Sequence, residues 1–121
     1  MRRAFGIIFV IVILVNLFML FGSRGEPAIR PKIGEVTDPI LLPVIEQLAD
    51  AIDANQSDPK LRMELGMTYE GATLNKLAES IYKQYTSQFP KRIIGWYRMA
   101  IVQQRMGQLE EAIQTLEAGV E

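Results

Sequence analysis

The apolar residues of this chain follow two patterns, one continuous and one periodic. Residues 4–22 form the continuous stretch, in which Asn16 is the one polar side chain and no residue is charged. A helix rises about 1.5 Å per residue, so this stretch covers roughly 28 Å, enough to cross the hydrocarbon core of a bilayer. A cleaved signal peptide has a shorter apolar region that ends in small residues, which Ser23-Arg24-Gly25 does not match. The pattern therefore predicts an uncleaved transmembrane signal-anchor over residues 1–22.

Residues 23–37 follow without any apolar periodicity. They contain Gly25, Pro27, Pro31 and Gly34, and glycine and proline at such spacing interrupt regular structure. We therefore expect a flexible linker. Fully extended, a linker of this length reaches about 50 Å, enough to hold the following domain clear of the lipid headgroups.

The remainder of the chain has apolar residues at helical spacing. An Asp-Pro start signal predicts a helix within residues 38–56, because Asp caps a helix and Pro fits its first turn. The apolar stripe of this helix is Val44, Leu48, Ala51 and Ile52. Similar stripes predict four more helices, over about residues 59–71, 74–88, 93–106 and from 109 onward.

The last four of these helices nearly repeat each other after 34 residues. Pro90 closes the first unit, and Trp96 opens the second. The paired positions are Leu65 with Met99, Gly66 with Ala100, Tyr69 with Gln103, Ala78 with Ala112 and Tyr82 with Leu116. A period of about 34 residues with this spacing is typical of stacked helix-turn-helix repeats, which serve as docking surfaces more than as catalysts.

The pattern resembles the tetratricopeptide repeat, whose signature is W-x₂-L-G-x₂-Y, then A-x₃-F, then P. The chain departs from it at Arg62, where Trp is expected, and at Gln103, where Tyr is expected. The resemblance implies an all-α fold: two repeats over residues 57–121, a degenerate half-repeat helix over residues 38–56, and a short right-handed α-solenoid of about five helices behind the membrane anchor. The residues that would pack the repeats together are Leu65, Gly66, Tyr69, Ala78, Tyr82, Pro90, Trp96, Ala100, Ala112 and Leu116.

The resemblance also implies a binding surface, because the first helix of each such repeat usually lines a concave, peptide-binding groove. In this chain that face would carry Met63, Met67, Glu70, Tyr97, Ile101 and Gln104. Methionine, isoleucine and tyrosine would make an adaptable apolar groove with polar edges. The alternative is that these side chains pack against other helices of the small stack. The Lys and Asn arrangement with which some family members hold a peptide's terminal carboxylate is not visible in this sequence.

The stack would also be incomplete. About three repeats are needed for a stable array, and this chain has two and a half without a polar capping helix. We therefore expect uncovered apolar surface at Ile113, Leu116 or Val120. Either self-association into a homo-oligomer or a partner helix could cover it.

Composition excludes most enzyme classes. The chain has no cysteine and no histidine, which removes thiolate and imidazole ligands, a Cys nucleophile and the commonest general base. Nothing basic or apolar is placed to shift the pKa values of the Asp50 and Asp53 pair. We therefore expect no enzyme activity, no cofactor and no metal. Residues 23–121 carry 11 Lys and Arg against 14 Asp and Glu, a balance that gives no reason to expect nucleic acid.

The layout predicts a single-pass membrane scaffold that binds a protein or peptide partner. Arg2 and Arg3 on one flank nearly balance Arg24, Arg30 and Lys32 on the other, so the positive-inside rule alone decides little. A short basic N-terminus favours a bacterial inner-membrane protein with a periplasmic domain. The layout is similar to assembly factors of envelope complexes, including those of cytochrome c maturation. The alternatives are a cytosol-facing targeting receptor, similar to mitochondrial import receptors, and a self-assembling structural subunit.

Overall fold

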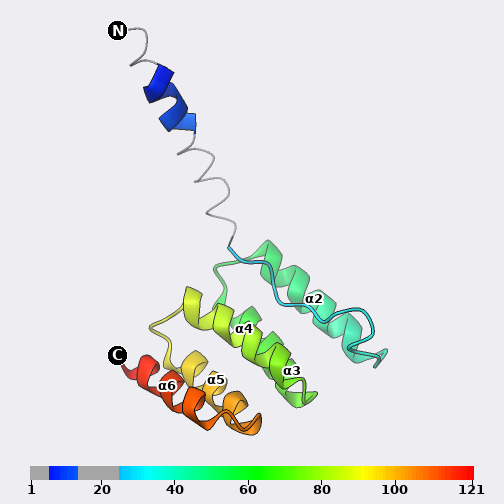
Figure 1. The fold of residues 1–121 in the computed structure, drawn as a ribbon. Coiled ribbons are helices and arrows are strands. Elements are labelled where there is room, and N and C mark those ends of the chain that lie inside the picture. The colour runs from blue at the N-terminus through cyan, green and yellow to red at the C-terminus, as the bar shows by residue number, and fades with distance from the viewer. Residues whose placement is uncertain (1–5, 14–24) are drawn as a thin grey trace.

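The computed structural model of the chain describes residues 6–13 and 25–121 (Figure 1). The helices after residues 6–13 are α2 (Leu41–Ala54), α3 (Pro59–Gly71), α4 (Asn75–Gln88), α5 (Ile93–Arg105) and α6 (Leu109–Val120). The described residues contain no strand, so the all-α prediction is confirmed for them. The predicted transmembrane segment, residues 4–22, lies largely outside the described ranges. Within those ranges, no helix has both the length and the apolar character needed to cross a membrane.

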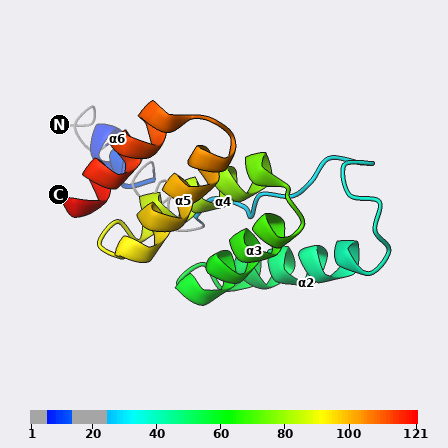
Figure 2. The same ribbon diagram turned by 90° about the horizontal axis from the view of Figure 1, so that it is seen from below.

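The five helices α2 to α6 stack in sequence order, each against the next (Figures 1 and 2). The first residues of α3 and α5 lie 34 positions apart, as do those of α4 and α6 and those of α2 and α4. The period of the sequence is therefore also the period of the helix starts. By this register α2 corresponds to the second helix of a pair, and residues 25–37 occupy the sequence positions of the missing first helix.

Two glycines set how closely the helices approach. A Cβ atom at Gly66 would lie 2.3 Å from Cε1 of Tyr82, and one at Gly95 would lie 2.3 Å from Cδ1 of Tyr85. Both distances are far shorter than a carbon–carbon contact allows. Tyrosine rings of α4 therefore fill the space left by the absent side chains, on α3 at one side and on α5 at the other.

The residues predicted to pack the repeats together are mostly buried. The buried ones are Leu65, Gly66, Tyr69, Ala78, Tyr82, Ala100 and Ala112. Trp96 is half-buried and donates its indole N–H to the carbonyl oxygen of Pro90 at 2.8 Å, while the Pro90 ring is exposed. Leu116 departs from the prediction, because its side chain is exposed. No described element packs on that side of α6 to cover it.

Helix α2 turns a different face to the core than its sequence predicts. Val44 is exposed, and Leu48 and Ala51 are half-buried, whereas Ile45 and Ala49 are buried. Ile52 is buried as well. The prediction rested on helical spacing alone, and spacing does not separate the two faces, because Ile45, Ala49 and Ile52 are also one turn apart. The start signal still acts, since Oδ1 of Asp38 accepts hydrogen bonds from the N–H groups of Ile40 at 2.8 Å and Leu41 at 3.3 Å.

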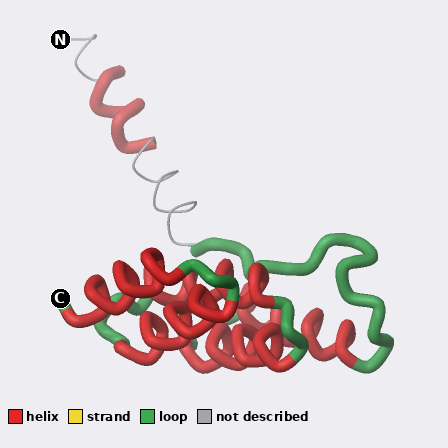
Figure 3. Tube along the Cα trace, turned by 60° about the horizontal axis from the view of Figure 1, so that its bottom comes forward, coloured by secondary structure: helices red, strands yellow, loops and turns green. Residues whose placement is uncertain are grey.

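Residues 25–36, called the N-terminal segment from here on, run as a loop along α2 (Figures 1 and 3). Their lack of helix agrees with the glycine and proline content. They do not form the expected free, flexible linker, however, because Ala28 and Val36 are buried in the same core as Ile45 and Tyr69. This segment is part of the folded domain and covers the side of α2 that a preceding helix would otherwise cover.

Candidate partner-binding surfaces

The N-terminal segment is held mainly through its backbone by side chains from α2, α3 and α4. Three backbone carbonyl oxygens accept hydrogen bonds: that of Glu26 from Arg62 Nη2 at 2.6 Å, that of Pro27 from Gln84 Nε2 at 2.7 Å, and that of Ile29 from the Tyr69 hydroxyl at 2.6 Å. The backbone N–H of Ala28 donates to Asp53 Oδ1 at 2.8 Å. Four consecutive residues thus each use one backbone polar group. Burial raises the pKa of Tyr69 to about 12, so its phenol stays protonated and donates even in mildly alkaline solution.

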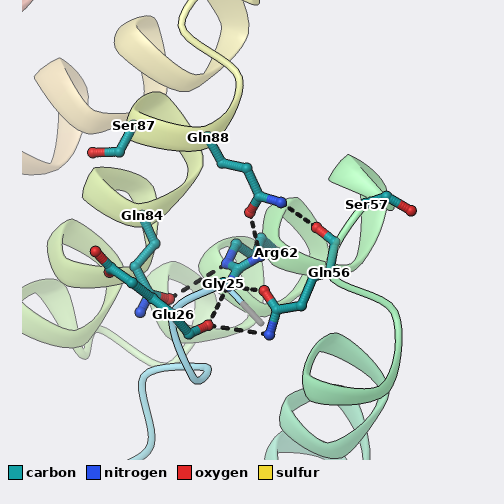
Figure 4. Close-up of a pocket in the computed structure, with 8 residues that line it drawn as sticks. All are labelled: Gly25, Glu26, Gln56, Ser57, Arg62, Gln84, Ser87 and Gln88. Carbon is teal, nitrogen blue, oxygen red and sulfur yellow. Dashed lines mark hydrogen bonds between the residues drawn. The ribbon is translucent and has the colours of Figure 1, made fainter. Parts of the chain in front are cut away.

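Arg62 is the centre of this arrangement (Figure 4). It stands where the repeat signature has Trp, and it is only 1% exposed. Its guanidinium donates to neutral oxygens alone, at 3.4 Å to Gln84, 2.6 Å to Gln88, 2.8 Å to Gln56 and 2.6 Å to Glu26 O. Among the described residues it forms no ion pair, and burial lowers its pKa. A buried charge is tolerated only when its donors are satisfied, and glutamines at three positions satisfy them here.

Arg30 fastens the same segment to α2 from the solvent side. Its guanidinium lies 2.7 Å from Asp50 and 2.8 Å from Asp53. Burial raises the pKa of Asp53, but the hydrogen bonds from Ala28 N–H and Arg30 outweigh it and leave that pKa below its ordinary value. The expectation that nothing basic lies beside Asp50 and Asp53 was therefore wrong, because the N-terminal segment folds back onto α2 and brings Arg30 to both carboxylates. No group of three or more Asp, Glu, Cys or His side chains in the described part of the chain is placed to hold a metal.

Glu70, predicted to line a peptide groove, is instead a buried link between three helices. It is 9% exposed, accepts a hydrogen bond from the Tyr82 hydroxyl at 2.6 Å, and pairs with Arg98 at 3.5 Å and Arg105 at 3.3 Å. The prediction for Glu70 was therefore wrong, because α5 reaches over α3 with two arginines and takes up the carboxylate. Burial and the bond to Glu70 both raise the pKa of Tyr82.

The other predicted groove residues line three separate hollows. Met63 borders one with Tyr85 and Ile94. Met67 borders a second, between α2 and α3, with Val44 and Leu48. The third hollow, which contains Tyr97, Ile101 and Gln104, lies between α5 and α6. The residues expected on one face therefore do not share a single groove.

The hollow between α5 and α6 is the most apolar of the three. We call it the α5–α6 groove; it is lined by Tyr97, Ala100, Ile101 and Gln104 of α5 and by Leu109, Ala112, Ile113 and Leu116 of α6, and encloses about 400 Å³. Ala100 and Ala112 are buried at its floor. Its walls remain open, with Leu109 59% and Ile113 57% exposed. Val120, one turn beyond Leu116, is exposed as well.

The internal repeat gives this groove a counterpart that helix α5 covers in part; Met67, one period before Ile101, stays 44% exposed. One period earlier, the corresponding surface lies on α3 and α4 and includes Glu70 and Tyr82. Helix α5 packs there, with Gly95 against Tyr85 and with Arg98 reaching Glu70. The α5–α6 groove thus occupies the position at which the next helix of a stack would lie, and no described residue covers it.

No protein family matches the sequence of this chain, and no curated protein is significantly similar to it. Its function is therefore inferred from its own residues.

Proposed function

We propose that this chain is a membrane-tethered scaffold, built of tetratricopeptide-like repeats in a short right-handed solenoid, that binds a helix of a partner protein. The observation that carries the proposal is the α5–α6 groove. It is apolar and open, and it repeats the surface on which the chain seats its own helix α5. Because the equivalent surface on α3 and α4 accepts helix α5, we expect the α5–α6 groove to accept a helix as well.

The exposed apolar side chains of the groove limit how tightly a partner helix can bind. Fully burying a Leu or Ile side chain is worth about 1.5–3 kcal/mol. Leu109, Ile113 and Leu116 are each about half exposed, and with Tyr97 they offer roughly 3–6 kcal/mol from this side of the interface. Association itself costs about 4 kcal/mol or more. The partner must therefore bring a comparable apolar face of its own, and we expect a dissociation constant no tighter than the micromolar range.

The membrane anchor completes the proposal. The apolar length of residues 4–22 supports a single span, and the layout of anchor, segment and repeats is similar to that of envelope assembly factors. We propose the bacterial inner membrane as the location, with residues 25–121 on the periplasmic side. On the domain side, the described chain is part of the fold from its first residues, since residues 26–29 are held against α2, α3 and α4.

The proposal is tested with a peptide that copies the helix found in the equivalent position. A fluorescent peptide with the sequence of residues 93–106 is titrated into the full chain in nanodiscs of zwitterionic lipid. We expect saturable binding, no tighter than the micromolar range and at least tenfold weakened by Ile113→Asp, which places a charge on the groove wall. Val44→Asp is the matched control, because Val44 is exposed in the hollow between α2 and α3, and this variant should bind as the wild type does.

Two results would count against the proposal. Equal binding to wild type and Ile113→Asp would show that the peptide binds elsewhere. If sedimentation shows a dimer that Ile113→Asp dissociates, and the peptide does not bind, a second copy of the chain covers the groove.

A further inference from the structure

We infer that the partner helix is basic along the edge that faces α6. This inference rests on the proposed function and specifies the chemistry of the partner. It follows from a comparison of the α5–α6 groove with its covered counterpart on α3 and α4.

The acidic side chains of α6 flank the groove. Successive residues of a helix are about 100° apart, so Glu110 and Glu117 lie next to the groove residues Leu109 and Leu116, on the outer edge of α6. Both glutamates are exposed, and neither pairs with a cation of the described chain. Residues 109–121 contain no Lys or Arg, so this edge carries negative charge that nothing described neutralises.

The same positions one period earlier carry the opposite charge. Lys76 and Lys83 of α4 correspond to Glu110 and Glu117 of α6. The edge of the covered surface is therefore basic, and the edge of the open groove is acidic. A helix that binds the open groove more tightly than a copy of α5 needs Lys or Arg where it passes α6.

The centre of the groove is less acidic than the centre of its counterpart on α3 and α4. The covered surface has Glu70 and Glu79 where the open groove has Gln104 and Ile113. Glu70 receives the two arginines of α5, and the open groove has no carboxylate in that place. Positive charge on the partner is therefore favoured at the α6 edge and disfavoured in the centre, which must be apolar.

The α5 edge of the groove determines which side of the partner helix carries the basic residues. Arg98 and Arg105 lie on the α5 side and are bound to Glu70. Helix α5 contains no Asp or Glu, so nothing on that side attracts a second basic row. The partner is thus an amphipathic helix about as long as α5, with an apolar stripe and one basic row beside it, the basic residues seven positions apart to match Glu110 and Glu117.

The test uses two peptides that share one apolar stripe and differ at the two flanking positions, with Lys in one and Glu in the other. Each is titrated by fluorescence anisotropy into the full chain in zwitterionic nanodiscs, at low salt and at 0.5 M NaCl. Exposed ion pairs are weak and salt-sensitive, so we expect the Lys peptide to bind about three- to tenfold more tightly at low salt, with most of this preference lost at high salt.

Charge-reversed variants identify the edge that is responsible. Glu110→Lys with Glu117→Lys should reverse the preference between the two peptides. Glu46→Lys with Glu64→Lys, the same change of charge at exposed sites on α2 and α3, should leave it unchanged. Equal binding of both peptides to the wild type, or an unchanged preference in the Glu110 and Glu117 variant, would overturn the inference and leave the proposed function standing. If neither peptide binds, the proposed function fails with it.

Discussion

The hydroxyl of Tyr69 offers a direct test of whether the N-terminal segment belongs to the folded domain. It donates to the carbonyl oxygen of Ile29 at 2.6 Å, across 40 positions of sequence. The Tyr69 ring is fully buried among the core residues of α3 and α4. Tyr69→Phe therefore removes one hydrogen bond and leaves the shape of the core unchanged.

The expected loss follows from that single bond. A hydrogen bond contributes about 0.5–1.5 kcal/mol net, and a buried acceptor left without a partner costs about 1–3 kcal/mol. The Ile29 carbonyl is only partly buried, so water can replace the hydroxyl in part. We expect the free energy of unfolding to fall by about 1–2 kcal/mol, and the midpoint temperature by about 4–8 °C for each kcal/mol in a domain of this size.

The assay is urea unfolding of the full chain in detergent micelles, followed by the fluorescence of Trp96. Tyr97→Phe serves as the control, because Tyr97 is 53% exposed and its hydroxyl is free to bond with water. Its loss should change stability by less than about 0.5 kcal/mol. In Tyr69→Phe, tryptic cleavage after Lys32 should also become faster than in the control. If both variants are equally stable and equally resistant to trypsin, the segment is not held as described.

Two further predictions concern helix packing and pH. Gly95→Ala should destabilise the domain by about 1–3 kcal/mol, because the new Cβ would lie 2.3 Å from the ring of Tyr85; Gly71→Ala, where a Cβ meets nothing within 4 Å, should be neutral or mildly stabilising, and equal effects in thermal unfolding would contradict the packing. Asp53→Asn should lower stability at neutral pH and flatten its fall in acid. The pKa of Asp53 is lower in the folded state than its ordinary value, so its contribution is complete above pH 3.8 and is lost as the pH falls through the folded-state pKa. Urea unfolding between pH 6 and about pH 2 measures this, and parallel curves for wild type and variant would refute it.

The helices could be predicted because their signals are local. Asp58 and Pro59 start α3 with the expected side-chain cap, from Asp58 Oδ1 to the Lys60 N–H at 2.9 Å. Apolar residues at helical spacing fixed the other boundaries to within a few positions. The small residue at Gly66 also follows from the period, because Ala100 stands one period later. Gly95 does not, because Leu61 stands one period earlier.

The N-terminal segment could not be predicted in the same way. Its backbone contacts with α2, α3 and α4 join residues 25 to 57 positions apart, and backbone groups leave no pattern in the sequence. Pro27 and Pro31 correctly indicated that the segment is not a helix. A segment without a helix can still be packed against the domain, as this one is.

The two residues that depart from the repeat signature, Arg62 and Gln103, have structural roles that a comparison with the motif does not reveal. Arg62, in place of Trp, holds the segment through neutral oxygens, and Gln103, in place of Tyr, is buried and accepts a hydrogen bond from Thr115 at 2.6 Å. A polar residue at a core position predicts nearby polar partners. The glutamines at positions 56, 84 and 88 could have indicated a buried polar partner for Arg62.

The central claim, that the α5–α6 groove binds a helix, is tested most directly by methyl NMR of the isoleucines. The full chain, labelled at its isoleucine methyl groups, is titrated in micelles with the peptide of residues 93–106. The account predicts that the signals of Ile113 and Ile101 shift together and saturate at one affinity, while that of Ile33, fully exposed on the N-terminal segment, stays in place. Shifts that are absent from Ile113 and Ile101, or that are equally large at Ile33, would contradict it.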